Sequence, residues 1–209
     1  MSLEWLLIRG SGLVAFGLLA LATVWGLLIS TKILGRSVKA KGVTWFHESL
    51  GIGSLLATAV HMVALSVHDY IDFTWADILI PGRATWRPTA VALGVIGFYV
   101  LALVTLSFYF KSLIGQAAWK AIHGASFGLF VATLTHGLMA GTDTAHPAVV
   151  ALYTATAVAT LLLLFIRISQ SRSAAQAPTE RARTARPERP PRQARHAAVE
   201  TEPAPMARD

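Results

Sequence analysis

The chain has no cysteine and few charged side chains. Without thiols it has no disulfide, no thiolate-bound iron–sulfur cluster, no Cys-ligated zinc and no covalent Cys-x-x-Cys-His haem attachment. Any bound metal therefore depends on His, carboxylate or Met side chains. Only 14% of the 209 residues are charged, whereas an ordinary soluble domain has about 25%. The mean hydropathy is +0.55, and both values point away from a soluble domain.

Long uncharged stretches account for the apolar surplus. Each has close to the ~20 residues that cross a bilayer core as a helix, and none alternates in polarity as a barrel strand does. The first follows Glu4 rather than a basic leader, which favours an uncleaved span over a signal peptide. The sequence therefore predicts an all-α integral membrane protein with a five-helix bundle. Its spans are residues 10–31, 49–67 (extendable back to 42), 88–110, 121–142 and 144–166.

The loop charges predict the orientation, because cytoplasmic loops of membrane proteins are rich in Lys and Arg. This rule places the N-terminus outside and the C-terminus inside. The cytoplasmic side would hold Lys32, Arg36, Lys39, Lys41, Lys111, Lys120 and Arg167. The outer side would hold Glu4, Asp69, Asp72, Asp77 and Asp143 together with Arg9, Arg83 and Arg87.

Two segments lie outside the predicted spans. Residues 70–86 mix acids with large apolar side chains, which favours an interfacial helix or a re-entrant loop on the outer surface. Residues 169–209 are rich in Arg, Pro and Ala and are predicted to be a disordered cytoplasmic tail, leaving 1–168 as the membrane domain. The tail supplies most of the basicity behind the pI of 10.3, so that value does not indicate nucleic-acid binding.

Four of the seven histidines lie inside the expected spans. His47 and His61 lie in the second span, and His123 and His136 lie in the fourth. Both spans run from inside to outside, and the two histidines of each are separated by about 20 Å at 1.5 Å per residue. Ionisable groups within spans are rare and are usually functional. The sequence therefore predicts two layers, His47 with His123 inside and His61 with His136 outside.

Paired neutral imidazoles among apolar side chains are suitable axial ligands for a b-type haem. Zinc usually takes a third or fourth ligand, and only Glu48 is near either layer. Glycines in both spans would leave room for a macrocycle, although they equally mark close helix packing. The angular positions of the histidines around their helices are less favourable for two such haem sites. At about 100° per residue, His61 lies ~40° around the helix from His47, but His136 lies ~140° from His123. Either a span is tilted or locally distorted, or the two haems are rotated relative to each other.

Other polar residues are weaker candidates for a functional role. Arg83 and Arg87 flank Trp86 on the outer side and are candidates for contacts with haem carboxylates, or equally for anchors at the membrane surface. His68 lies at the outer boundary and His146 precedes Pro147, and neither has an assigned role. Residues 10–15 match the dinucleotide fingerprint Gly-x-Gly-x-x-Ala, but no strand precedes them and the match is interpreted as chance.

The histidine spacing resembles that of the ferric reductase-like transmembrane domain. In that family, shared by NADPH oxidases, ferric-chelate reductases and the haem subunit of bacterial methionine sulfoxide reductase systems, one helix has histidines 14 residues apart and a second has histidines 13 apart. His47/His61 and His123/His136 reproduce this pattern. Looser similarity extends over residues 45–143, including His68-Asp69-Tyr70 and Trp119 to His123.

The resemblance implies two haem b groups and electron transfer across the membrane. His47 and His123 would hold the inner haem, and His61 and His136 the outer. After the fifth stretch only the tail follows, so FAD or FMN is expected only through a partner. The predicted donor is a separate cytoplasmic flavoprotein or a quinol, and the acceptor is ferric iron, oxygen or an extracytoplasmic partner protein.

A haem-free membrane protein is the alternative, either a permease, a divalent-metal carrier or a scaffold. Composition favours a bacterial plasma membrane as the location. If all four histidines only joined helices, each would contribute about 0.6 kcal/mol, but this reading does not explain why they align in two layers.

Overall fold

The structure, a computed structural model, describes residues 3–33, 40–67 and 72–184. By their internal contacts the residues form two compact units, Met1–Arg167 and Ile168–Asp209. The described residues contain helices and no strand. In chain order the helices are α1 (Leu3–Thr31), α2 (Ala40–Ser66), α3 (Trp75–Leu79), α4 (Pro88–Ser107), α5 (Lys111–Ile114), α6 (Gln116–Gly124), α7 (Ser126–Ala140) and α8 (Pro147–Thr184).

Long apolar segments within α1, α2, α4 and α8 could each cross a bilayer. They leave large apolar side chains exposed, including Leu56 at 63% and Phe165 at 68%. Exposure on this scale is unfavourable in water and suits contact with lipid. The all-helical membrane character predicted from the sequence is therefore supported, whereas the orientation stays a prediction. The four segments are Trp5–Thr31, Gly42–Ser66, Pro88–Ser107 and Pro147–Ser173.

The expected fourth span is not one continuous helix. Residues 121–142 are divided between α6 and α7, with Ala125 between them. The 15 residues of α7 extend about 22 Å at 1.5 Å per residue, which is short for a complete crossing. Gly124 and Gly128 lie on either side of the interruption, and glycine weakens a helix by about 1 kcal/mol relative to alanine. His123 therefore lies on α6 and His136 on α7, with a break in the helix between them. Of the alternatives raised by their angular offset, a local distortion is the one that the structure shows in this span.

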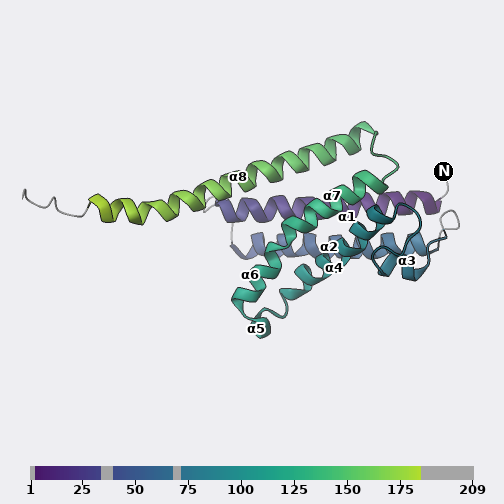
Figure 1. Ribbon diagram of the computed structural model, residues 1–209, viewed down its shortest axis with the longest axis horizontal. Coiled ribbons are helices and arrows are strands. Elements are labelled where there is room, and N and C mark those ends of the chain that lie inside the picture. Colours follow the sequence, from purple (N-terminus) through teal and green to yellow (C-terminus); the bar gives the residue numbers. More distant parts are fainter. Residues whose placement is uncertain (1–2, 34–39, 68–71, 185–209) are drawn as a thin grey trace, which may run out of the picture. The chain divides into compact units, whose positions relative to one another are not determined.

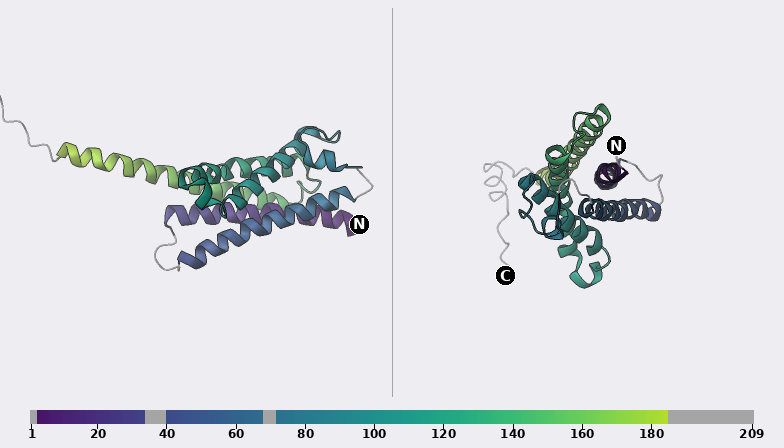
Figure 2. Two further views of the ribbon diagram at one scale, coloured as in Figure 1. Left: turned by 90° about the horizontal axis from the view of Figure 1, so that it is seen from below. Right: turned by 90° about the vertical axis from the view of Figure 1, so that its right-hand side faces the viewer.

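The helices of the first unit pack mainly as two pairs (Figures 1 and 2). α1 lies along α2 and α4 lies along α7, while α2 with α4 and α1 with α7 make less extensive contacts. Within the first pair, the buried Ser54 hydroxyl donates a hydrogen bond to the Ala15 carbonyl at 2.9 Å. Trp25 Nε1 donates to the Val43 carbonyl at 3.1 Å. These bonds fix how α1 and α2 are aligned along their length.

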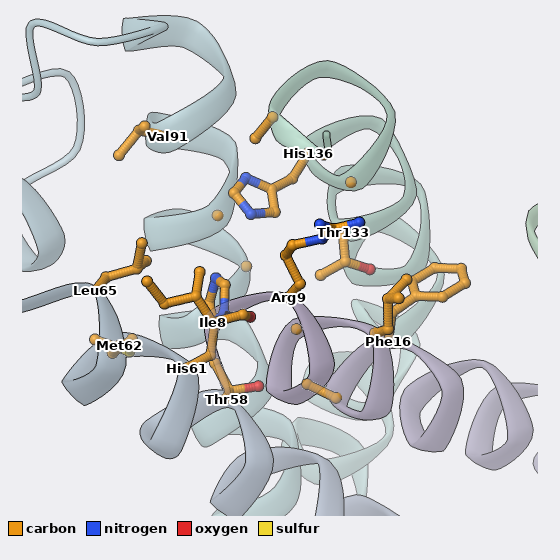
Figure 3. A pocket seen from close by; sticks show the side chains of 18 of the residues that line it. Ile8, Arg9, Phe16, Thr58, His61, Met62, Leu65, Val91, Thr133 and His136 are labelled. Carbon is orange, nitrogen blue, oxygen red and sulfur yellow. Dashed lines mark hydrogen bonds between the residues drawn. The ribbon is translucent and has the colours of Figure 1, made fainter. Parts of the chain in front are cut away.

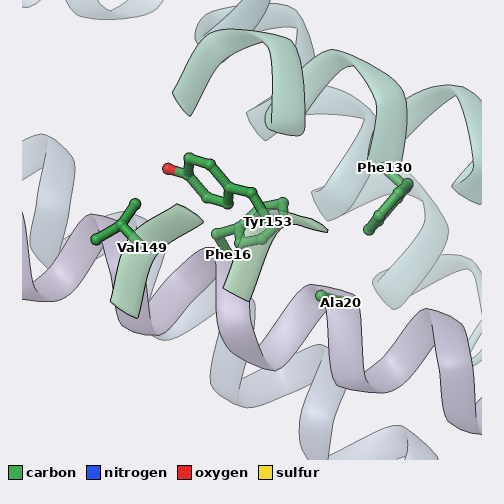
Figure 4. Packing of buried hydrophobic residues seen from close by; sticks show 5 residues of the cluster. All are labelled: Phe16, Ala20, Phe130, Val149 and Tyr153. Carbon is green, nitrogen blue, oxygen red and sulfur yellow. The ribbon is translucent and has the colours of Figure 1, made fainter. Parts of the chain in front are cut away.

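An aromatic cluster packs the start of α8 against α1 and α7 (Figure 4). The rings of Phe16 and Tyr153 meet edge to face with their centroids 4.9 Å apart, and Phe130 lies 6.0 Å from Phe16. Ala20 is completely buried in the same cluster, where its small side chain lets the surrounding helices come close.

A short helix, α3, lies in the segment between α2 and α4 for which the sequence predicts an interfacial helix or a loop. It begins with a capping box, in which the Asp77 backbone N–H donates to the Thr74 hydroxyl at 3.3 Å and the Thr74 backbone N–H donates to the Asp77 carboxylate at 3.0 Å. The Thr74 hydroxyl also donates to the same carboxylate at 2.6 Å. These bonds hold the pKa of Asp77 below its usual value. The Tyr99 hydroxyl donates to the Leu79 carbonyl at 2.9 Å and so attaches α3 to α4. Its location at a membrane surface remains a prediction.

Helix α8 continues beyond the last predicted span. The sequence predicts disorder from residue 169, whereas the helix runs to Thr184. Extending an existing helix avoids the cost of nucleation, and residues 169–176 contain Ala, Gln and Arg, which are good helix formers. The rest of the predicted tail, 185–209, lies outside the described residues.

Candidate functional site

The two histidines of the predicted outer layer line one cavity (Figure 3). His61 enters it from α2 and His136 from α7, and Figure 3 shows both imidazoles directed into the space between the helices. The cavity lining is largely apolar and includes Leu13, Phe16, Val91, Val95, Phe98 and Leu101.

Each outer imidazole is held by a backbone carbonyl of a neighbouring helix. His61 Nδ1 lies 2.8 Å from the Ile8 carbonyl oxygen on α1, and His136 Nδ1 lies 2.7 Å from the Ala90 carbonyl oxygen on α4. Since a carbonyl only accepts, Nδ1 must carry the proton and donate it in both cases. In the neutral ring, Nε2 then has a free lone pair. Metal-binding histidines commonly have this arrangement.

The two histidines of the predicted inner layer also lie together. The ring centroids of His47 and His123 are 5.9 Å apart, with the ring planes at 71°. Two imidazoles that bind one metal ion from opposite sides, each at about 2.0 Å, have centroids roughly 6 Å apart. The separation therefore fits a shared metal. These two histidines do not line the cavity of the outer pair.

The inner pair differs from the outer pair in its hydrogen bonding. His47 Nδ1 is buried and has no hydrogen-bond partner. The His123 ring is instead stacked on Trp119, with centroids 5.2 Å apart and planes at 20°. Lys111 Nζ lies 4.3 Å from the centroid of the Trp119 ring, a distance at which a cation attracts an aromatic ring.

Arg83 and Arg87, the predicted partners for haem carboxylates, do not line the cavity. Arg87 begins α4 in a left-handed conformation with φ of 43°. Its guanidinium donates to the Met139 carbonyl and lies 4.9 Å from the Trp86 ring centroid. Arg87 therefore joins the start of α4 to the end of α7.

Arg9 is the arginine that the structure places in the cavity, where it forms an ion pair with Asp143. Both side chains are about three-quarters buried. Figure 3 shows the Arg9 side chain beside the two histidines. The sequence alone places Arg9 only among the charges of the outer side. Its proximity to Ile8, whose carbonyl holds His61, places it next to the outer pair.

Of the remaining histidines, the structure describes His146, which does not line the cavity of the outer pair. His146 Nδ1 accepts a hydrogen bond from the backbone N–H of Ala148 at 3.3 Å, next to the start of α8. His68 lies outside the described residues. Among the described residues there is no group of three or more His, Asp or Glu side chains that could hold a metal ion. A metal ion bound by either pair would therefore find no third His, Asp or Glu ligand within the part of the chain that the structure describes.

No family model, no curated protein and no solved structure matches the chain. The resemblance to the ferric reductase-like domain therefore rests on the histidine spacing and the residues around it.

Proposed function

We propose that the protein is a di-haem b membrane protein that carries electrons between the two sides of a bilayer. The observation that carries this proposal is the outer pair. His61 and His136 come from different helices to one apolar cavity, and each has Nδ1 bonded to a carbonyl. Two imidazoles of this kind would be suitable ligands for the iron of one haem b.

The residues present fit such a group. His61 and His136 would bind at Nε2 in the outer layer, and His47 and His123 in the inner layer. Arg9, paired with Asp143, places a positive charge beside the outer pair. The apolar lining excludes water from the same space. Haem b, when bound, supplies one-electron exchange between ferric and ferrous iron.

The two layers are suitably placed for transfer across a membrane. α2 is one continuous helix, so His47 and His61 lie about 21 Å apart along it at 1.5 Å per residue. Most of a hydrocarbon core of roughly 30 Å is thereby covered. We propose that the electrons come from a cytoplasmic flavoprotein or a quinol and leave to ferric iron, oxygen or an extracytoplasmic partner, as in ferric reductase-like systems.

The test is the spectrum of the purified protein in detergent. Two b-type haems per chain in the dithionite-reduced minus oxidised difference spectrum are expected. Substituting His61→Ala or His136→Ala should remove the outer haem and keep the inner one, whereas His146→Ala, outside both pairs, should keep both. Colourless protein after haem-supplemented expression would overturn the proposal in favour of a haem-free permease, carrier or scaffold.

A further inference from the structure

Three of the four histidines lie against a glycine of a neighbouring helix. A β-carbon built on Gly12 would lie 3.1 Å from Cε1 and Nδ1 of His61. On Gly26 it would lie 3.0 Å from Cε1 of His47, and on Gly94 2.6 Å from Cε1 of His136. An alanine at Gly94 would overlap the His136 ring, and alanines at the other two would be unusually tight. Each ring therefore occupies the space that a side chain would otherwise take.

The glycines and the hydrogen-bonded carbonyls belong to the same helical turns. The carbonyl that accepts from His61 is that of Ile8, four residues before Gly12. The carbonyl that accepts from His136 is that of Ala90, four residues before Gly94. In a helix the β-carbon of a residue points toward the N-terminus, over the carbonyl of the preceding turn. Glycine leaves that carbonyl uncovered, so that an imidazole can approach its second lone pair.

His47 shares one part of this arrangement, the contact with a glycine of the neighbouring helix. It contacts Gly26 of α1. Its Nδ1 is not within hydrogen-bond geometry. Gly12 and Gly26 are 14 residues apart, as are His61 and His47, so one antiparallel alignment of α1 and α2 serves both histidines.

These contacts are specific to certain glycines. A β-carbon on Gly17 of α1 or on Gly128 of α7 would meet nothing within 4 Å. On Gly97 of α4 it would meet the Thr133 methyl at 3.1 Å rather than a histidine. Glycine as such therefore does not explain the pattern, and the chain itself provides the control positions.

We infer that Gly12, Gly94 and Gly26 are positioning residues for the metal ligands. Gly12 and Gly94 each leave open a carbonyl that accepts from an imidazole Nδ1 and so keeps Nε2 free, whereas Gly26 positions His47 by close contact with its ring. This inference rests on the proposed function. Gly12 and Gly94 act on the outer layer through His61 and His136, and Gly26 acts on the inner layer through His47. The arrangement sets the ring orientation and the tautomer, both of which affect how strongly a histidine binds iron.

The experiment compares single alanine variants of the purified, haem-containing protein. Haem content per chain, the low-spin ferric EPR signals and the midpoint potential of each haem are measured. Partners of a ligating histidine typically contribute about 10- to 100-fold to metal affinity. Gly12→Ala and Gly94→Ala are therefore expected to weaken outer haem binding by about 10-fold or more and to shift the outer EPR signal and potential. Gly26→Ala should change only the inner signal.

The controls separate a role in positioning from a role in packing. Gly17→Ala should leave both haems unchanged. Gly53→Ala, whose β-carbon would meet the Leu18 side chain at 3.3 Å outside the cavity, should lower thermal stability without shifting either EPR signal. If Gly94→Ala does not accumulate, Gly12→Ala has the milder contact and decides the result. Retention of both haems with unchanged EPR signals and potentials in Gly12→Ala and Gly26→Ala would overturn the inference and leave the haem proposal intact. Absence of haem from the unaltered protein would instead overturn the proposed function.

Discussion

His123 differs from the other three histidines in the neighbour that orients its ring. It is stacked on Trp119 of its own helix instead of facing a glycine. Trp119 Nε1 is itself buried without a hydrogen-bond partner. The orientation of His123 therefore depends on ring stacking, which tolerates sliding and tilting more than a bond from Nδ1 to a carbonyl does.

Replacing Trp119 should consequently affect one haem and not the other. Trp119→Ala is expected to shift the inner low-spin EPR signal and the inner midpoint potential, whereas Trp119→Phe, which keeps a ring against His123, should shift them less. Trp45→Ala is the matched control because this tryptophan is 67% exposed. Equal spectra for all three variants would show that the stack has no influence on the ligand.

We expect that binding of the outer haem and stability of the fold both depend on the ion pair between Arg9 and Asp143. Removing one partner of a buried ion pair costs about 3–5 kcal/mol, and less here because each side chain is about a quarter exposed. Arg9→Gln is expected to lower outer haem retention and the unfolding temperature, whereas Arg83→Gln, on an exposed side chain outside the cavity, should change neither. A larger loss of haem from Arg83→Gln would return the carboxylate-binding role to the arginine predicted from the sequence.

The sequence predicted the histidine pairs but not their charged neighbour. Both His61 with His136 and His47 with His123 are brought together, because spacing along a helix directly sets depth in the bundle. Arg9 pairs with Asp143, 134 positions away, and no local sequence pattern predicts a contact over that separation. Arg83 and Arg87 were chosen because they are close in sequence to Trp86, whereas access to the cavity depends on how α4 meets α7.

At the scale of helices, the interruption at Ala125 is the main departure from the sequence prediction. A run of apolar residues gives the length of a hydrophobic segment but not whether its hydrogen bonding is continuous. The angular offset of ~140° between His123 and His136 was compatible with a tilted span, a distorted span or rotated haems, so it did not by itself predict the interruption. By contrast, α2 is continuous between His47 and His61.

Phe16 should be more important for stability than its exposed neighbours on α1. It is 7% exposed and packs against Phe130 and Tyr153. A Phe→Ala change costs about 3–5 kcal/mol in a soluble core, and a smaller loss is expected here because lipid is as apolar as the helix interior. Thermal unfolding in detergent should show a lower midpoint for Phe16→Ala and little change for Val14→Ala, whose side chain is 55% exposed. Equal midpoints would contradict a stabilising role for the aromatic cluster.

At the scale of the whole molecule, the absence of cysteine allows a direct test of orientation. Single cysteines at the exposed positions Ser112 and Thr85 would be the only thiols in the chain. The positive-inside rule predicts that a membrane-impermeant maleimide labels Thr85→Cys on intact cells, and Ser112→Cys only after permeabilisation. Labelling in the opposite order would reverse the predicted direction of electron flow.

The pairing of α1 with α2 and of α4 with α7 has a consequence for assembly. Each pair contains both a histidine and the carbonyl that aligns it, His61 with Ile8 in one and His136 with Ala90 in the other. Each helix pair can thus orient its own histidine before the two pairs associate, since membrane helices can insert independently and associate afterwards. A haem between them would be a cross-link across the weaker contact of the molecule. Haem supply would then control not only the redox capacity of the protein but also the final step of its maturation in the membrane.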